Sequence, residues 1–180
     1  TFVAAPNFEA PTDSGGGNVY DVTVQVADGN GGTDTQAIAV TVTNVNEAPV
    51  ITSDGGAASA SLSVAENQTA VTTVTSTDVD GAAPSYSIVG GADAARFTID
   101  AATGVLAFNA APDFESPSDA GADNVYDVTV QVADGNGGTT TQAIAFTVSN
   151  VNEAPLITSA AAVSVAENQS GVVTVTSSDV

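Results

Sequence analysis

Apolar and polar residues alternate along most of the chain with a period of two, which is typical of strands that bury one face. The segments 125–133 and 142–148 show this most clearly, with Val, Tyr, Ile and Phe alternating with Asp, Thr, Gln and Ala. Between them stands "ADGNGG", whose glycines tolerate positive φ, so this stretch predicts a hairpin connection. No segment shows a convincing helical period, and the abundance of Val and Thr suits a pleated sheet.

Seven strands are predicted between residues 50 and 149, the first of them split into two halves at a sheet edge. Short strands with turn signals between them predict an all-β fold, a Greek-key β-sandwich of immunoglobulin-like layout. The expected ranges are 50–53 with 60–65, then 69–76, 84–89, 95–99, 104–108, 124–133 and 139–149. The expected core is Leu62, Val64, Val74, Tyr86, Ile88, Phe97, Ile99, Leu106, Phe108, Tyr126, Val128, Val130, Ile144, Phe146 and Val148.

Three motifs recur at one spacing. The letters "NVYDVTVQVADGNGG" occur at 18–32 and return unchanged 106 positions later, as do "VNEAP" and, in similar form, "PNFEAP". A unit of this length is large enough to fold on its own, so we expect tandem seven-stranded sandwiches in an excerpt from a longer array. The chain then holds the C-terminal part of one repeat, a complete repeat and the N-terminal part of the next, at 1–47, 48–153 and 154–180.

The charge balance excludes several classes of partner. One basic residue stands against 21 acidic ones, which gives a net charge of −20. No basic patch is present to neutralise phosphate, so we expect no nucleic acid and no anionic membrane surface as partner. No apolar run approaches the length of a transmembrane helix, so we expect no membrane insertion in this segment. A hydrophobic fraction of 43% with regular alternation favours a folded protein over a disordered one.

Missing residue types argue against an enzyme. The chain has no His and no Lys, so a nucleophile has no base of the kind that a catalytic triad needs. Paired carboxylates can hydrolyse glycosides, but the short loops of a sandwich imply no cleft. The absence of Cys means that no disulfide stabilises the fold, and it does not define the compartment.

The acidic residues gather at strand ends and at the connections between repeats. Successive strand ends alternate between the two poles of a sandwich, so the acids fall into two sets. We expect Glu66, Asp113 and Glu115 near one pole, and Asp78, Asp80 and Asp134 near the other. Stacked repeats bring these poles together, where carboxylates repel unless a cation lies between them. Ca²⁺ takes six to eight oxygen ligands at about 2.3–2.6 Å, whereas the absence of His and Cys disfavours zinc and softer metals.

Five short motifs follow one another in a fixed order, namely "AEN", "DVD", "DFE", "ADG" and "NVNEAP". This set resembles the calcium motifs of cadherin repeats, and "YSIVGGADAARFTIDAATGVLAF" at 86–108 is similar to the cadherin middle segment. The Ala, Thr and Val content, the "VNEAP" linkers and the "DGNGG" hairpins look more like the cadherin-like repeats of large bacterial surface adhesins of the RTX or biofilm type. The resemblance implies bound Ca²⁺ and an extracellular, cell-surface location.

The resemblance also implies which residues hold calcium at two junctions between repeats. At the first junction, Asn7, Glu9, Asn44, Asn46 and Glu47 would meet Asp78, Asp80 and Asp134. At the second, Glu66, Asp113, Glu115, Asn150, Asn152 and Glu153 would meet Asp179. Asp28 would serve a junction before Thr1.

Several positions depart from the cadherin pattern. Phe114 replaces an Arg, Asn7 replaces an Asp, and the linker is one residue shorter with Asn44 or Asn150 in place of Asp. Because these changes lower the charge of the ligand set, the resemblance implies fewer or less occupied ion sites than in animal cadherins.

The expected function is that of calcium-rigidified spacer repeats in a cell-surface adhesin, which project a distal binding region in cell adhesion or biofilm formation. The partners are then calcium ions and the neighbouring repeats of the same chain. One alternative is a lectin-like module for cell-surface or matrix polysaccharide, although the three Tyr and six Phe mostly fit the core pattern. Another is a self-associating repeat in which like chains pair or exchange strands to form fibres.

Overall fold

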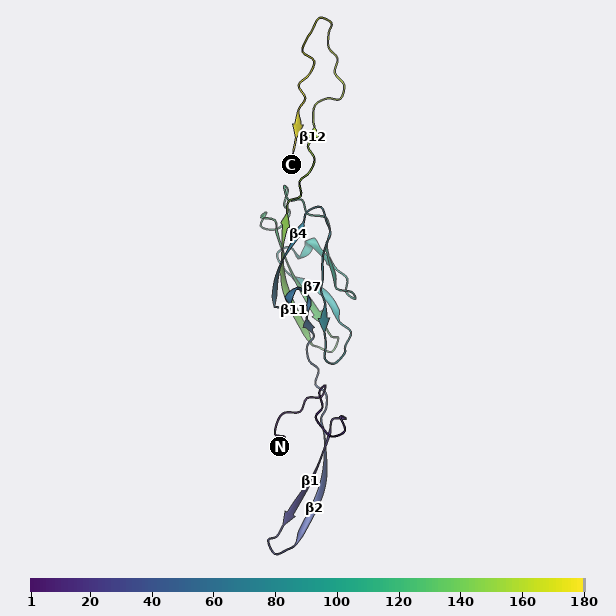
Figure 1. Ribbon diagram of the computed structural model, residues 1–180, viewed down its shortest axis with the longest axis vertical. Coiled ribbons are helices and arrows are strands. Elements are labelled where there is room, and N and C mark those ends of the chain that lie inside the picture. Colours follow the sequence, from purple (N-terminus) through teal and green to yellow (C-terminus); the bar gives the residue numbers. More distant parts are fainter. Residues whose placement is uncertain (180) are drawn as a thin grey trace.

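The computed structural model describes residues 1–179, and it has an elongated shape in which three parts follow one another along one axis (Figure 1). A hairpin of β1 (Val19–Ala27) and β2 (Thr33–Thr41) lies near the N-terminus. A β-sandwich occupies the middle, and the C-terminal segment extends beyond it. No helix among the described residues is long and apolar enough to cross a bilayer.

Two sheets form the sandwich. One has four strands in the order β4 (Ser59–Ala65), β11 (Thr139–Ser149), β10 (Val125–Ala133) and β7 (Ser85–Gly90). The other has three in the order β5 (Ala70–Thr73), β9 (Val105–Phe108) and β8 (Phe97–Ile99). Their inner faces meet in aromatic contacts such as Phe108 against Tyr126, with ring centroids 5.1 Å apart. The all-β sandwich prediction is therefore confirmed.

The first strand is split into two parts, as the sequence predicts. Its first half, β3 (Val50–Ile51), pairs antiparallel with β6 (Ser76–Thr77). Its second half, β4, runs parallel to β11 along seven residue pairs, from Ser59 opposite Ala143 to Ala65 opposite Ser149. A 3₁₀ turn, η1 (Ser53–Gly55), joins the halves.

Two predicted ranges differ from the structure. The strand predicted at 95–99 begins only at Phe97, because Ala94–Arg96 form the 3₁₀ turn η2, in which the Arg96 N–H donates to the Asp93 carbonyl. The strand predicted at 69–76 is interrupted between β5 and β6, where the Val74 N–H donates to the Gly104 carbonyl. Both interruptions come from backbone pairing that side-chain alternation does not encode.

One hydrophobic core fills the sandwich. Every residue predicted for it is buried or packs half-buried against it, and Ile51 and Val132 join them. Phe97 stacks on Phe108 with centroids 4.6 Å apart, and Phe146 contacts both rings. Burial of each large apolar side chain contributes about 1.5–3 kcal/mol, so this core holds the loops at both poles in place.

The flanking segments repeat parts of this pattern without the rest of the sandwich. Strands β1 and β2 pair in the same register as β10 and β11. At the C-terminus, β12 (Leu156–Ile157) pairs with β13 (Ser177–Ser178) as β3 pairs with β6. The counterpart of β4 at 160–166 forms no strand, so a complete sandwich forms once among the described residues. The division at 1–47, 48–153 and 154–180 stays a prediction.

Burial of identical residues in the two hairpins gives a matched stability test. Ile144 is 1% exposed, whereas its counterpart Ile38 is 38% exposed. We expect Ile144→Ala to lower the free energy of unfolding by about 2–5 kcal/mol because it leaves a cavity in the core. Ile38→Ala should cost less than about 1 kcal/mol. Urea unfolding followed by circular dichroism measures both, and equal losses would contradict the burial difference.

Candidate metal centres

Glu66 connects three segments at the pole where β4 and β11 end. It follows β4 directly and is 2% exposed. Its Oε2 accepts the Phe114 N–H at 2.8 Å, and its Oε1 accepts the Val151 N–H at 2.7 Å. One carboxylate thereby fixes the "DFE" loop and the linker after β11 to the end of β4.

Two further acids join Glu66 in what we call the distal acidic group, which consists of Glu66, Asp113 and Glu115. One carboxylate oxygen from each lies within 4.8 Å of the others. Glu115 accepts a hydrogen bond from the Asn150 amide, and Glu153 Oε1 accepts one from Asn67 Nδ2 at 3.2 Å. A pocket at this pole is lined by Glu66, Asn67, Asp113, Glu115, Ser116 and Glu153.

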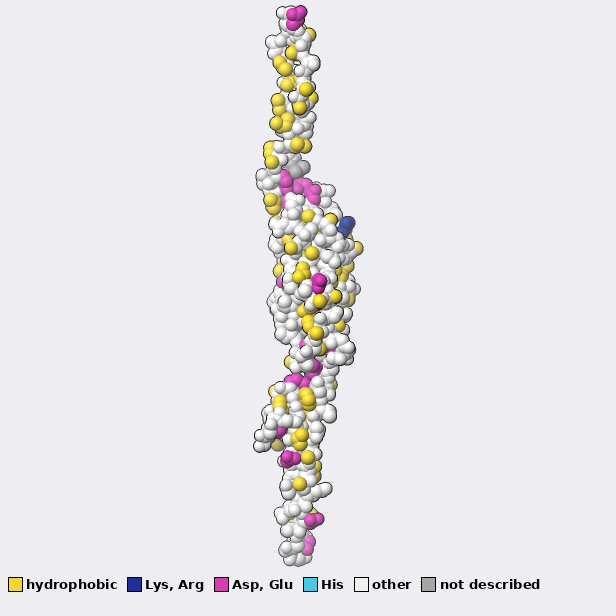
Figure 2. Space-filling model, turned by 90° about the vertical axis from the view of Figure 1, so that its right-hand side faces the viewer, with side chains coloured by type: hydrophobic (Ala, Val, Ile, Leu, Met, Phe, Trp, Pro, Cys, Tyr) yellow, Lys and Arg dark blue, Asp and Glu magenta, His cyan; other side chains and the backbone are white. Residues whose placement is uncertain are grey.

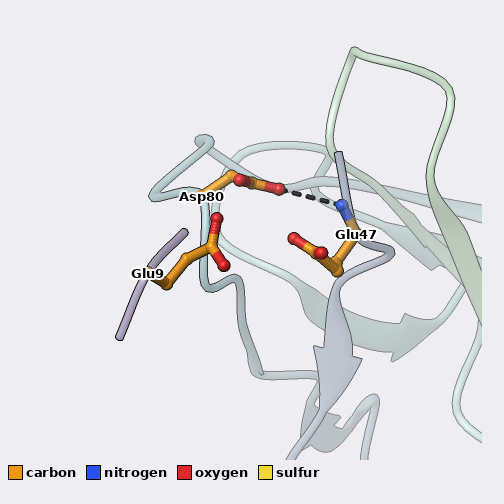
Figure 3. A group of neighbouring side chains, drawn as sticks. All are labelled: Glu9, Glu47 and Asp80. Atoms are coloured by element: carbon orange, nitrogen blue, oxygen red, sulfur yellow. Dashed lines mark hydrogen bonds between the residues drawn. The ribbon is translucent and has the colours of Figure 1, made fainter. Parts of the chain in front are cut away.

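A second set, the proximal acidic group of Glu9, Glu47 and Asp80, forms at the opposite pole. Figure 3 shows their side chains pointing toward one another from three separate segments, and one oxygen of each lies within 4.8 Å of the others. The Glu47 N–H donates to Asp80 Oδ2 at 2.9 Å. In the space-filling view (Figure 2), Asp and Glu side chains gather at the upper and lower ends of the wide central part.

The linker asparagines bind the same acids. Asn44 Nδ2 donates to Asp80 Oδ1 at 2.7 Å, and Asn46 Nδ2 donates to Asp134 Oδ2 at 2.7 Å. Asp134 caps the β10–β11 hairpin, because its Oδ1 accepts the N–H of Asn136 at 2.7 Å. The hairpin tip packs closely on the linker, since a Cβ at Gly138 would lie 2.8 Å from the Ala48 Cα. Residues from two repeats therefore meet at this pole.

The remaining candidate residues lie elsewhere or make local contacts. Asp78 Oδ1 accepts the Asp80 N–H at 2.8 Å, which ties it to the proximal group. Asn7 Oδ1 accepts the Ala10 N–H within its own turn, and Asn152 donates to the Glu153 carbonyl. Asp28 caps the tip of the β1–β2 hairpin, and Asp179 is exposed in the C-terminal segment. Neither Asp28 nor Asp179 is part of the two groups of three carboxylates that form among the described residues, and calcium binding by Asn7 and Asn152 stays a prediction.

Sequence reasoning missed one polar partner and two buried acids. Asn67 contacts Glu153 and has a positive φ of 64°; its recurrence in both "VAENQ" motifs is the signal that identifies it. Asp93 and Asp119 are buried because they accept backbone N–H groups, such as Ala120 on Asp93 Oδ1 at 2.7 Å. Burial of an acid in this chain is therefore not in itself a sign of a metal ligand.

The pKa values of the acids differ within each group. Hydrogen bonds from the Phe114 and Val151 N–H groups lower the pKa of Glu66. In contrast, loss of hydration raises the pKa of Glu115, and the neighbouring charges of Glu66 and Glu153 add to this effect. Each shift has the sign that hydrogen-bond donors or like charges produce on a carboxyl group.

The proximal group shows the same division. The Asn44 side chain, followed by the Glu47 N–H, lowers the pKa of Asp80, and Asn46 foremost lowers that of Asp134. Loss of hydration raises the pKa of Glu47, together with the charges of Glu9 and Asp80. In each group, hydrogen-bond donors lower the pKa of at least one carboxyl group, while the pKa of another is raised. This difference is expected where several negative charges lie close together.

Two orphaned oxygens test whether these residues fit a cation. Asp78 Oδ2 and Glu153 Oε2 are buried and have no hydrogen-bond partner among the described residues. A buried carboxylate oxygen without a donor is costly unless a cation neutralises it. The available donor atoms are all carboxylate, amide or carbonyl oxygens, which suit a hard divalent ion. The two poles are therefore chemically suited to such an ion.

Comparison with known proteins places the chain in a family. A family model described as the Cadherin domain matches residues 60–150, just over half of the 180 residues. The chain belongs to the cadherin family. The segment that matches the cadherin model contains Glu66, Asp80, Asp113, Glu115 and Asp134, whereas the linker at 44–47 lies outside it.

Solved cadherin structures share the fold. Drosophila N-cadherin EC1-4 is 18% identical with a TM-score of 0.59, and the alignment covers 96% of this chain and 44% of that one. Human CDH23 EC21-23 is 18% identical with a TM-score of 0.57, and the alignment covers 90% of this chain and 54% of that one. The protocadherin gammaB7 EC3-6 cis-dimer is 23% identical with a TM-score of 0.54, and the alignment covers 78% of this chain and 36% of that one. The chain therefore spans between about a third and about half of the length of these three cadherin structures. A search of curated proteins gives no match.

The pKa shifts predict opposite titration behaviour for Glu66 and Glu115. In EGTA, carboxyl NMR titration should place the pKa of Glu66 below 4.5 and that of Glu115 above 4.5. Ionised Glu66 then stabilises the fold at neutral pH, and this contribution is lost as the pH falls through its folded pKa. Glu115 contributes stability only at low pH, and loses it as the pH rises through its folded pKa. A pKa of Glu66 above that of Glu115 would contradict the hydrogen-bond assignments.

Proposed function

We propose that this chain is part of a calcium-rigidified extracellular spacer in a cell-surface adhesin. The observation that carries the proposal is the presence of an acidic group at each pole of the sandwich. The proximal group joins Glu9 and Glu47, from the preceding repeat and the linker, to Asp80 of the complete repeat. An ion held there would bind two neighbouring repeats at once.

Calcium fits these groups better than other ions. Ca²⁺ accepts six to eight oxygen ligands in flexible geometry, and the residues offer carboxylates and amides without any His or Cys. At the first junction the ion would be held by Glu9, Glu47, Asp78, Asp80 and Asp134, with the Asn44 and Asn46 oxygens in support. At the second it would be held by Glu66, Asp113, Glu115 and Glu153.

The chain's own residues prepare these sites. The buried Glu66 already aligns the "DFE" loop with the linker through two backbone N–H groups. Asp134 is 6% exposed and held at the hairpin tip by backbone donors. When bound, the ion supplies positive charge that offsets the repulsion among these acids. The linker acids are then kept against the adjoining sandwich, which restricts bending between repeats.

The magnitude of such binding is sufficient for a junction. Extracellular modules of this kind bind Ca²⁺ with Kd values of roughly 10⁻⁴–10⁻³ M. With about 10 mM Ca²⁺ and a Kd of about 10⁻⁴ M, one site stabilises the folded state by about 2.7 kcal/mol. That is a large share of the stability of a typical domain.

The wider role follows from the family and the repeats. Cadherin family membership supports an adhesion protein outside the cell. The "VNEAP" linkers and "DGNGG" hairpins, which resemble those of large bacterial surface adhesins, support a parent that is a long bacterial fibre in cell adhesion or biofilm formation. In that setting the repeats set the distance between the cell surface and a distal binding region.

The identical hairpins provide a matched test of calcium binding. Calcium at about 10 mM should raise the melting temperature relative to EGTA by on the order of 10 °C. Asp134→Asn should reduce this increase, because it weakens a ligand at the first junction. Asp28→Asn removes the same hairpin cap in the same sequence context and should leave the increase unchanged. An unchanged melting temperature of the native chain on adding EGTA would overturn the proposal.

A further inference from the structure

Three hydrogen-bond donors from one short linker converge on two aspartates of the next sandwich. Asn44 Nδ2 and the Glu47 N–H donate to the two oxygens of Asp80, at 2.7 and 2.9 Å. Asn46 Nδ2 donates to Asp134 Oδ2 at 2.7 Å. Hydrogen bonds to a charged acceptor are stronger than those between neutral groups. Because all three donors lie within four residues, closing one contact brings the others near their acceptors.

These donors lie where the negative charge is most crowded. Glu9, Glu47 and Asp80 have carboxylate oxygens within 4.8 Å of one another, and the chain contains one basic residue. Like charges at such distances push the linker away from the sandwich. The amide N–H groups therefore attract the linker to these aspartates without any ion.

An asparagine side chain can face an aspartate as a hydrogen-bond donor or face a cation as an oxygen ligand. It carries both an NH₂ donor and a carbonyl oxygen, so one rotation exchanges the group that faces the aspartate. An aspartate at position 44 or 46 would present acceptors only. It would add repulsion when no cation is present and a ligand when one is bound.

We propose that Asn44 and Asn46 latch the first junction when no cation is bound, by donating their amide hydrogens to Asp80 and Asp134. Entry of the cation releases the latch, because the aspartate oxygens then face the ion and the amides turn their own oxygens toward it. This second step rests on the calcium binding proposed above, whereas the latch itself does not. The linker consequently stays in contact with the next sandwich in low calcium, instead of separating from it.

The second linker provides a control of the same composition. Asn150 and Asn152 are the counterparts of Asn44 and Asn46, but Asn150 donates to Glu115 of its own repeat. Asn152 and Asn46 share the local bond to the following glutamate's carbonyl, at 3.0 and 3.2 Å. Replacing the second pair therefore removes the same groups without removing a contact to Asp80 or Asp134.

The latch is tested in the ¹⁵N-labelled full chain in EGTA, by hydrogen exchange of the Glu47 amide and by the heteronuclear NOE across 43–48. The Glu47 amide should be protected, and Asn44→Ala with Asn46→Ala should accelerate its exchange about 10-fold, as loss of a bond to a charged group implies. Asn150→Ala with Asn152→Ala should leave it unchanged. Core amides such as that of Val130 report that each variant is folded. An unprotected Glu47 amide in the native chain, or equal acceleration by both pairs, overturns the latch.

Aspartate at both positions separates the latch from calcium binding. In EGTA, Asn44→Asp with Asn46→Asp should lose protection of the Glu47 amide as the alanine pair does, and calcium should restore it. Retained protection in EGTA would overturn the latch. Absence of any calcium-dependent shift at the Asp80 and Asp134 amides of the native chain would overturn the proposed function instead. The comparison of the two alanine pairs in EGTA would still decide the latch.

Discussion

Repulsion between carboxylates at the two poles of the sandwich is the constraint on which the arrangement of this chain depends. The strands that fill the core carry few charges, and two groups of acids lie at the ends where one repeat meets the next. With 21 acidic residues and one basic residue, salt bridges within the chain cannot offset this repulsion. Backbone N–H groups, asparagine amides and a cation are the groups that can. The proximal and distal acidic groups use the first two in the structure, and the third is the basis of the proposed function.

The rigid sandwich fixes the positions of the acids at its two poles. Tyr126, Phe146 and their neighbours form a fully buried core. This core restricts the conformations of the loops at its ends. Glu66 is placed by the end of β4 and ordered by donors from two other segments. The identical hairpin at 18–32 carries Asp28 at the equivalent tip, where its Oδ1 accepts the Asn30 N–H. Asp134 makes the same kind of turn cap and is also contacted by the preceding linker, through Asn46.

Much of this arrangement follows from side-chain periodicity. Alternation predicts the strands and the core, and the alternation of strand ends predicts that Glu66, Asp113 and Glu115 share a pole. Local backbone hydrogen bonds are not encoded in that period, so the 3₁₀ turn at Ala94–Arg96 and the turn that retains Asn7 were not predictable. Asn44 meets Asp80 as predicted, but the sequence does not define which of its groups faces the aspartate, because the residue type permits both an oxygen ligand and an N–H donor. The structure has the N–H of Asn44 facing Asp80.

The most direct measurement is a crystal structure of the chain grown in calcium, with anomalous scattering data to locate the ions. Binding of calcium at the junctions predicts anomalous peaks between Glu47, Asp80 and Asp134 and beside Glu66, Asp113 and Glu115. The carboxylates should then surround each peak at about 2.3–2.6 Å. Hydrated and separated side chains at both poles, with no anomalous peak beside either linker, would contradict a junction stiffened by calcium.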